Sequence, residues 1–502
     1  MGHAAYDLGT HRRALACGIL LGVAAASGCA VNAVTGDPEL TISSSERQRA
    51  LGTKAAKSIE ALMGMVDDRA LSDYVSTIGE RLVRALPGKD VNYTFKVLDS
   101  DVPNAMSLPG GYVYITRGLL AYLNSEDELA CVLGHEIGHV AAHHSSHQRT
   151  RGILASPFAI ATGIAGAATS IVAPAVGDLI AGVGKITTGA VLASYSREQE
   201  READRLGMTL AAKSGWSPTG MTGMLETLSR SEKLATGRIR KTGFLDSHPS
   251  TPERAAAATK RAQELRIAES TGSKLDRLGF YHRLEGLIIG DNPKNGIFVE
   301  NRFLHAALDL SVEFPDSWIL QNSRDAVAAI EKSQQAALVM QGLGEGDDPL
   351  VAASTRRMVL GFSLQDVKRS TINGLPAAHV TTVVAGTRGR TALSATWIVH
   401  HDLIYEIVGL CSPEQYPQFE QALNGSADSF APLSSSDRAR IKADQLTVAA
   451  ARRDETLHDV LDRIDATWSP AEAAVANALA DGGQLPEGRA IKAPVSRAYT
   501  AK

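Results

Sequence analysis

A helix with two histidines four residues apart constrains this 502-residue chain more than any other feature. Ser125 can cap this helix and Glu128 completes a capping-box pattern, so we expect it to run through His135-Glu136-Ile137-Gly138-His139. Residues at i and i+4 lie on one helix face, where two imidazoles can bind one metal ion. Glu136 between them can then act as a general base on a water held by that metal.

The third ligand has to come from elsewhere in the chain. His143 lies eight residues after His135, about 12 Å along the helix axis, so one ion cannot bind both of them and His139. We therefore expect His143, His144 and His147 to be solvated or to cap the end of the helix.

Carboxylates are nearly absent from the stretch that follows. Between His139 and Glu198 the chain has only Asp178. Glu200 and Asp204 then lie four residues apart on a predicted helix, so one can bind a metal while the other supports a ligand from behind it. A solvated, salt-bridged helix face is the alternative interpretation of this segment when it is taken alone.

Two motifs resemble those of a known family. They are His-Glu-Ile-Gly-His at 135–139 and Ser-Arg-x-x-Glu-x-x-Ala-Asp at 196–204, and they resemble the family-48 zinc metallopeptidases, gluzincins that include HtpX and the CAAX prenyl proteases. Residues 104–116 and the His-Pro segment 248–254 resemble further parts of the family. The likeness covers about residues 31–268 and is nearest to the family's bacterial periplasmic lipoprotein branch.

The resemblance implies a catalytic zinc site with one ion per chain. The implied ligands are His135, His139 and Glu200. Three protein ligands leave the fourth position of tetrahedral zinc for water, and Glu136 would be the general base. Asp204 would support a ligand from outside the coordination shell. His248 would stabilise the oxyanion or occupy the fourth position in a resting state, and the alternative is a histidine that merely precedes a helix.

Residues 104–116 resemble the edge strand beside the family's active site. Tyr112 to Thr116 alternate after a Gly-Gly turn, and we expect this segment to be an edge strand that binds an extended substrate by strand addition. The expected substrate-binding residues are Gly111, Tyr112, Val113 and Tyr114. Recognition through the backbone favours broad specificity.

The N-terminus predicts export from the cytoplasm. Arg12-Arg13 precede an uncharged stretch that ends in small residues before Cys29, which is typical of a lipoprotein signal peptide over residues 1–28. Cys29 would be lipidated, and Val31 to Gly36 resemble the opening of the lipoprotein branch. Ala30 favours sorting to the outer membrane, with the protein facing the periplasm. A plain signal peptide with an incidental cysteine is the alternative.

Composition narrows the class of partner. The chain has a net charge of −4, whereas nucleic-acid binders usually carry an excess of basic residues. Four cysteines in 502 residues are too few for a fold that is held together by disulfides. Residues 152–177 carry no charge, yet they contain Pro157 and Pro174 and are rich in alanine and glycine. We expect 152–193 to form a buried or lid-like helical pair between the two metal-binding helices, with membrane contact as the alternative.

The expected fold class is α+β. The expected units after the signal peptide are a mainly helical zincin-type metalloprotease domain with a small edge-strand sheet (29–268), a linker (269–299), an α+β sandwich-like accessory domain that loosely resembles PsbP (300–435), and a small LysM-like module (440–502). His400-His401 is expected to be a strand-end pair rather than a metal site. The LysM-like module is expected to be a structural cap, with peptidoglycan contact as the alternative.

The resemblance implies a zinc-dependent endopeptidase that cleaves misfolded or unassembled envelope proteins. Its partners would be protein or peptide substrates and the membrane that holds the lipidated Cys29. One alternative is a chaperone-like or peptidoglycan-associated binding lipoprotein with an idle metal site. Another is an integral membrane protease that uses residues 152–193 to span the bilayer.

Overall fold

The structure is a computed structural model that describes residues 28–31, 38–41, 45–87, 91–144, 195–234, 243–265, 276–386, 389–480 and 483–500. Most of the predicted signal peptide, His147 and the predicted helical pair at 152–193 lie outside the described residues. Cys29 lies in a short strand, and its lipidation stays a prediction. Among the described residues, no helix combines the length and the apolar character that a membrane span requires.

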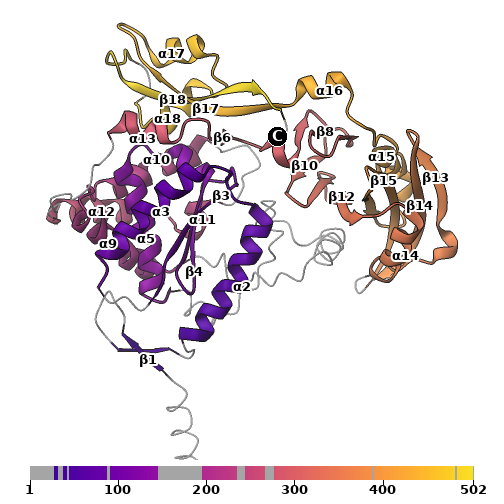
Figure 1. Cartoon of the computed structure of the whole chain (residues 1–502), viewed down its shortest axis with the longest axis horizontal. Coiled ribbons are helices and arrows are strands. Elements are labelled where there is room, and N and C mark those ends of the chain that lie inside the picture. Colours follow the sequence, from indigo (N-terminus) through magenta and orange to yellow (C-terminus); the bar gives the residue numbers. More distant parts are fainter. Residues whose placement is uncertain are drawn as a thin grey trace, which may run out of the picture.

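The first unit is mainly helical and also contains a two-stranded and a three-stranded sheet (Figure 1). Its strands are β1 (Gly28–Val31), β2 (Pro38–Thr41), β3 (Thr94–Leu98), β4 (Ala105–Leu108) and β5 (Tyr112–Thr116). Its helices are α2 (Ser45–Met63), α3 (Arg69–Arg84), α4 (Arg117–Tyr122), α5 (Glu126–Ala141), α9 (Arg197–Lys213), α10 (Gly220–Leu234), α11 (Phe244–Ser247) and α12 (Pro252–Glu264).

Helix α5 carries the His-Glu-Ile-Gly-His motif through the middle of this unit. Its predicted start is confirmed, because the Ser125 side chain accepts a hydrogen bond from the backbone N–H of Glu128. The reciprocal half of the capping box is replaced, since the Glu128 carboxylate accepts from the N–H of Asn124 at 2.7 Å. A Cβ added to Gly207 of α9 would lie 2.5 Å from the backbone nitrogen of His135. Glycine therefore allows α9 to pack directly against the backbone of α5.

The prediction that Tyr112 to Thr116 form an edge strand is wrong. The strand order is β3-β5-β4, so β5 is the central strand and pairs with β3 in parallel and with β4 antiparallel. Both backbone edges of Tyr112 to Thr116 are therefore used within the sheet, and no substrate can add to this strand. Strand β4 is the edge strand that lies against α5.

The predicted linker 269–299 is also folded over much of its length. Helix α13 (Arg277–Arg283) buries Phe280 and Tyr281 completely in the core of the first unit. Strand β6 (Ile288–Ile289) follows, and then a 3₁₀ turn, η2 (Pro293–Asn295). The Arg117 side chain donates to the backbone carbonyls of Ile288 and Gly290 at 2.7 Å each, which fixes this segment to the first unit. The linker was predicted from the polar residues at the start of this segment, but the helix that follows them has a buried apolar face.

The second unit is built on a seven-stranded antiparallel sheet in the order β10-β11-β12-β16-β15-β14-β13. The strands are β10 (Ile319–Asn322), β11 (Ala326–Ile330), β12 (Ala336–Glu345), β13 (Lys368–Ile372), β14 (Leu375–Gly386), β15 (Gly389–His400) and β16 (Leu403–Cys411). A three-stranded sheet precedes it, with β7 (Ile297–Val299), β8 (Arg302–His305) and β9 (Leu310–Glu313). Helices α14 (Pro349–Leu360) and α15 (Tyr416–Asp428) belong to the two separate cores on opposite faces of the large sheet. Short η3 (Leu364–Asp366) follows α14. The mixture of helix and sheet agrees with the expected α+β class.

The C-terminal module packs on the first unit (Figure 1). It follows α16 (Ser435–Arg440) and contains β17 (Lys442–Ala450), α17 (Leu457–Ile464), α18 (Pro470–Ala476) and β18 (Ala490–Ala498). Strand β17 pairs with β18 and with β6 from the first unit. Leu446 and Ala490 of the module are buried in the same core as the residues of α5. The module therefore shares a hydrophobic core with the helix that carries the metal-binding motif.

A buried lysine joins this module to the start of α5. Lys492 on β18 is fully buried, and its ammonium group donates to the backbone carbonyl of Leu123. The same nitrogen lies 4.5 Å from the centre of the Tyr281 ring. Burial lowers the pKa of Lys492 and raises the pKa of Glu128, and the attraction between the two charges opposes both shifts. The opposite charge of Glu128 therefore helps to offset the cost of burying the ammonium group.

We predict that Lys492→Met lowers the free energy of unfolding by about 3–5 kcal/mol, because it leaves a buried carboxylate without this cation. Adding Glu128→Gln should recover part of that loss, since the variant pair has no buried charge to compensate. The measurement is urea denaturation followed by circular dichroism. Lys442→Met, at an exposed position on β17, is the control. A loss of less than about 1 kcal/mol in the single variant would show that the pair is not a stabilising contact.

Candidate metal centre

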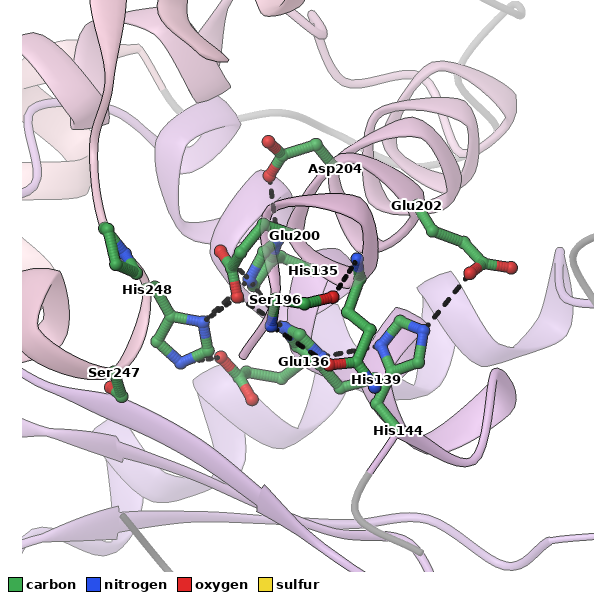
Figure 2. Close-up of polar contacts among 12 residues, drawn as sticks. His135, Glu136, His139, His144, Ser196, Glu200, Glu202, Asp204, Ser247 and His248 are labelled. Carbon is green, nitrogen blue, oxygen red and sulfur yellow. Dashed lines mark hydrogen bonds and ion pairs between the residues drawn. The ribbon is translucent and has the colours of Figure 1, made fainter. Parts of the chain in front are cut away.

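Four side chains from three segments converge on one point in the first unit (Figure 2). His135 and His139 come from α5, Glu200 comes from α9, and His248 follows α11. Each offers one ligand atom, and these atoms all lie within 4.8 Å of one another. The structure thus brings the three predicted ligands together and adds His248 to them.

The distances between ligand atoms are those of groups that share a cation. Nε2 of His139 lies 3.0 Å from Nε2 of His135 and 3.3 Å from Oε1 of Glu200. Nδ1 of His248 lies 2.9 Å from the same Glu200 oxygen and 3.1 Å from Nε2 of His135. Nitrogen and carboxylate donors in this number suit zinc.

Glu136 supplies an independent test of whether a cation fits here. Its side chain is fully buried, and neither of its oxygens has a hydrogen-bond partner among the described residues. Oε1 lies 3.5 Å from Nε2 of His248. A buried carboxylate without hydrogen bonds is costly unless positive charge lies close by. The donor set therefore fits a divalent ion that would compensate this carboxylate.

Asp204 and Arg254 support the site from behind His135. Oδ1 of Asp204 lies 2.8 Å from Nδ1 of His135. Because a carboxylate only accepts, that nitrogen must carry the proton, and the lone pair of Nε2 then faces the other ligands. Arg254 holds Asp204 with two hydrogen bonds of 2.7 and 2.8 Å and reaches Oε2 of Glu200 at 2.6 Å. Asp204 occupies the place expected of it, whereas the part played by Arg254 was not predicted.

The surroundings of Glu200 and His139 favour the protonation states in which these two residues bind a cation. Burial raises the pKa of Glu200, but the positive charges of His248 and His135 outweigh burial, so the net pKa lies well below its ordinary value. Burial and the neighbouring His135 lower the pKa of His139 well below its ordinary value. Glu200 is therefore ionised and His139 neutral near pH 7, the forms in which these residues bind metal.

Aromatic rings cover the site. The ring of Tyr195 stacks on His139 with centroids 3.8 Å apart, and Phe244 stacks on His248 at 4.4 Å. A hydrogen bond of 3.2 Å from the backbone N–H of Tyr195 to the carbonyl of Ser247 joins the two covering segments. The predicted ligands and Glu136 are at most 2 % exposed. Sequence reasoning missed Tyr195, whose only signal was its position just before the cap of α9.

The expectation for His144 is wrong. This residue was expected to be solvated or to cap the helix, but it is 3 % exposed and its Nδ1 lies 2.9 Å from Nδ1 of His139. The chain turns at His143, whose φ of +50° ends the helix and directs the next side chain inward. His143 itself is partly exposed, as expected.

The predicted substrate-binding residues do not face the metal centre through their side chains. The hydroxyls of Tyr112 and Thr53 lie 3.0 Å apart, and Tyr114 donates to Glu60 at 2.7 Å, so both tyrosines point toward α2. Val113 is buried in the core, and Gly111 makes the turn before β5 with a φ of +89°. These four residues therefore contribute to the packing and the turn of the sheet, and their side chains do not line the metal centre.

A second cluster, Asp309 with His400 and His401, lies in the accessory unit. Nε2 of His400 donates to the backbone carbonyl of Asp309 at 2.8 Å, and the Asp309 carboxylate is bound by Arg438 and by the N–H of Leu433. Hydrogen bonds and the arginine charge satisfy these groups without a metal. The prediction of a strand-end pair at 400–401 is consistent with this arrangement.

Residues 70–262 match the model of a family described as Peptidase family M48. The chain contains a peptidase family M48 domain. The beta-barrel assembly-enhancing proteases of Yersinia pestis and Escherichia coli K12 are 27% and 26% identical to it, covering 49% and 46% of this chain and 50% and 48% of theirs. Metalloprotease YcaL of E. coli K12 is 36% identical over 36% of this chain and 66% of its own length. The chain spans about half the length of the assembly-enhancing proteases that it matches.

We predict that Arg254→Met lowers the unfolding free energy of the M48 domain by about 3–5 kcal/mol in the metal-free protein, because Asp204 and Glu200 stay buried without their cation. Arg254→Lys should cost less, since it keeps the charge and loses only the fork of hydrogen bonds. The measurement is urea denaturation in the presence of a chelator. Arg205→Met, at an exposed position on α9, is the control, and an equal stability of the two methionine variants would contradict the prediction.

Proposed function

We propose that this protein is a zinc-dependent endopeptidase. The observation that carries the proposal is the convergence of His135, His139 and Glu200 around a point beside the fully buried carboxylate of Glu136. A zinc ion, when bound, supplies Lewis-acid chemistry that polarises the substrate carbonyl and makes water more acidic. The M48 domain and its metalloprotease relatives support this assignment.

Glu136 is the proposed proton carrier. Its oxygens accept no hydrogen bond from the described residues, so they are available to accept a proton from the attacking water. The same carboxyl group then gives the proton to the leaving amine. Asp204 and Arg254 hold His135 in place while this happens, because they fix the orientation of its ring.

His248 has two proposed roles that belong to two states of the site. Its Nδ1 lies 2.9 Å from Glu200 and 3.1 Å from Nε2 of His135, so with zinc bound this nitrogen would be available as a fourth ligand. In a substrate complex the imidazole would turn away from this position and donate to the oxyanion. Phe244 stacks on His248, and Tyr195 stacks on the neighbouring His139, so both rings pack against the cluster that contains this imidazole.

The proposed substrate groove follows β4 rather than β5. The carbonyl of Pro103 accepts from the N–H of Phe244 at 2.8 Å, which shows that the backbone groups at this position point away from β5. Backbone groups alternate along a strand, so those of Ala105 and Ser107 point the same way. An extended substrate that pairs with them would lie along the free edge of β4, beside α5.

Strand addition predicts a period of two in substrate binding. N-methylation of single backbone amides in a peptide substrate should raise KM about fivefold to tenfold at alternate residues, because each lost hydrogen bond costs about 1 kcal/mol. The measurement is steady-state cleavage of a series of peptides that are methylated one position at a time. Peptides with altered side chains and free amides are the control. A uniform response along the peptide would contradict pairing with β4.

Glu136→Gln should abolish cleavage of casein while leaving zinc content and folding unchanged, because an amide cannot carry the proton. Wild-type activity should disappear with EDTA and return with zinc. Glu198→Gln, at an exposed position on α9, should behave as the wild type. Cleavage by Glu136→Gln equal to that of the wild type would contradict the proposed mechanism, whereas no cleavage by the wild type would favour the alternative of a binding protein with an idle metal site.

The substrates that we propose are misfolded or unassembled proteins of the cell envelope. Backbone recognition along β4 favours broad specificity, and the relatives from Y. pestis and E. coli are named for beta-barrel assembly. Lipidation of Cys29 would hold the protein at the outer membrane, facing the periplasm. The test compares the envelope proteins that co-purify with Glu136→Gln and with the wild type, and a set that does not differ would oppose this substrate class.

A further inference from the structure

His144 links one proposed metal ligand to a carboxylate on the neighbouring helix. Its Nδ1 lies 2.9 Å from Nδ1 of His139, on the side of the ring that faces away from the metal centre. Its Nε2 lies 3.2 Å from Oε2 of Glu202 (Figure 2). The side chain of His144 is 3 % exposed and that of Glu202 is 17 % exposed. The three residues form a hydrogen-bonded chain from α9 to α5.

The direction of each hydrogen bond follows from the chemistry of its ends. An ionised carboxylate only accepts hydrogen bonds, so Nε2 of His144 carries a proton and donates a hydrogen bond to Glu202. In the neutral ring that donates from Nε2, Nδ1 has no proton and can only accept. Nδ1 must then accept from Nδ1–H of His139. The remaining nitrogen of His139, Nε2, is left with its lone pair pointing at Glu200 and His135.

His135 is held in the same tautomer, with the proton on Nδ1, by a different hydrogen-bond partner. Asp204 accepts directly from Nδ1 of His135, and Arg254 fixes Asp204. Among the described residues, the hydrogen-bond partner of His139 Nδ1 is His144 and not a carboxylate. Glu202 is therefore joined to His139 through His144.

We propose that His144 and Glu202 are positioning residues that hold His139 in the tautomer whose Nε2 binds the metal, an inference that rests on the proposed zinc site. A neutral imidazole in the other tautomer presents an N–H to the ion and cannot bind it. Support of a metal-binding histidine by an outer hydrogen-bond partner commonly changes metal affinity by about 10–100-fold. The pair His144–Glu202 therefore tunes zinc affinity without touching the ion.

The test measures zinc affinity of the full-length protein by competition with a chromophoric chelator. His144→Leu should weaken zinc binding by about 10–100-fold, and Glu202→Ala should weaken it about tenfold. His144→Asn should recover most of the affinity, because its amide oxygen can accept from His139. The matched controls are His143→Asn, where φ is positive and asparagine is tolerated, and Glu198→Ala on the exposed face of α9.

A second readout does not involve zinc. In the zinc-free protein, ¹⁵N correlation spectra of selectively labelled histidines should show His139 protonated on Nδ1 in the wild type and mixed between tautomers in His144→Leu. Wild-type affinity and an unchanged His139 tautomer in that variant would overturn the proposal. If His144→Leu does not fold, the test rests on Glu202→Ala. A zinc affinity of Glu202→Ala equal to that of the wild type would also overturn the proposal. Failure of the wild type to bind zinc at all would instead overturn the proposed function.

Discussion

The close packing of α5 against α9 is the contact on which the rest of the metal centre depends. A Cβ on Gly138 would lie 2.9 Å from the Cα of Ala203, so the two helices meet backbone to backbone along the motif. Helices that pack through larger side chains lie about 8–10 Å apart. At such a separation the short side chain of Glu200 could not approach both His135 and His139. Two segments that are remote in sequence thus form one site because glycine lines their contact.

Charge balance is the second constraint, and it explains why the site needs Arg254. Glu136, Glu200 and Asp204 place three carboxylates in a region that is almost free of solvent. Arg254 pairs with two of them, and its burial is tolerated only because those partners are present. The third, Glu136, accepts no hydrogen bond from the described residues, and the imidazole of His248 lies 3.5 Å from its Oε1. A cation at the centre would complete this balance, so metal binding and stability of the M48 domain are expected to be coupled.

The sequence predicted the local elements of the site better than their surroundings. Caps and the 3.6-residue period are local signals, and they located α5, its histidine pair and Glu200 on a second helix. The order of strands is not a local signal, because an alternating pattern is the same in a central strand and in an edge strand. The burial of His144 depends on Glu202, 58 residues away, and that of Lys492 on Leu123, 369 residues away. No spacing rule could have predicted these contacts.

Helix α5, which carries two of the proposed metal ligands, is held at both of its ends by residues outside the motif. At its start, Lys492 from β18 donates to the carbonyl of Leu123, and at its end His144 joins His139 to α9. The C-terminal module is therefore part of the framework that positions α5, since its strand and the M48 domain share one core. A peptidoglycan contact, if this module makes one, would have to use the faces that do not pack on the M48 domain.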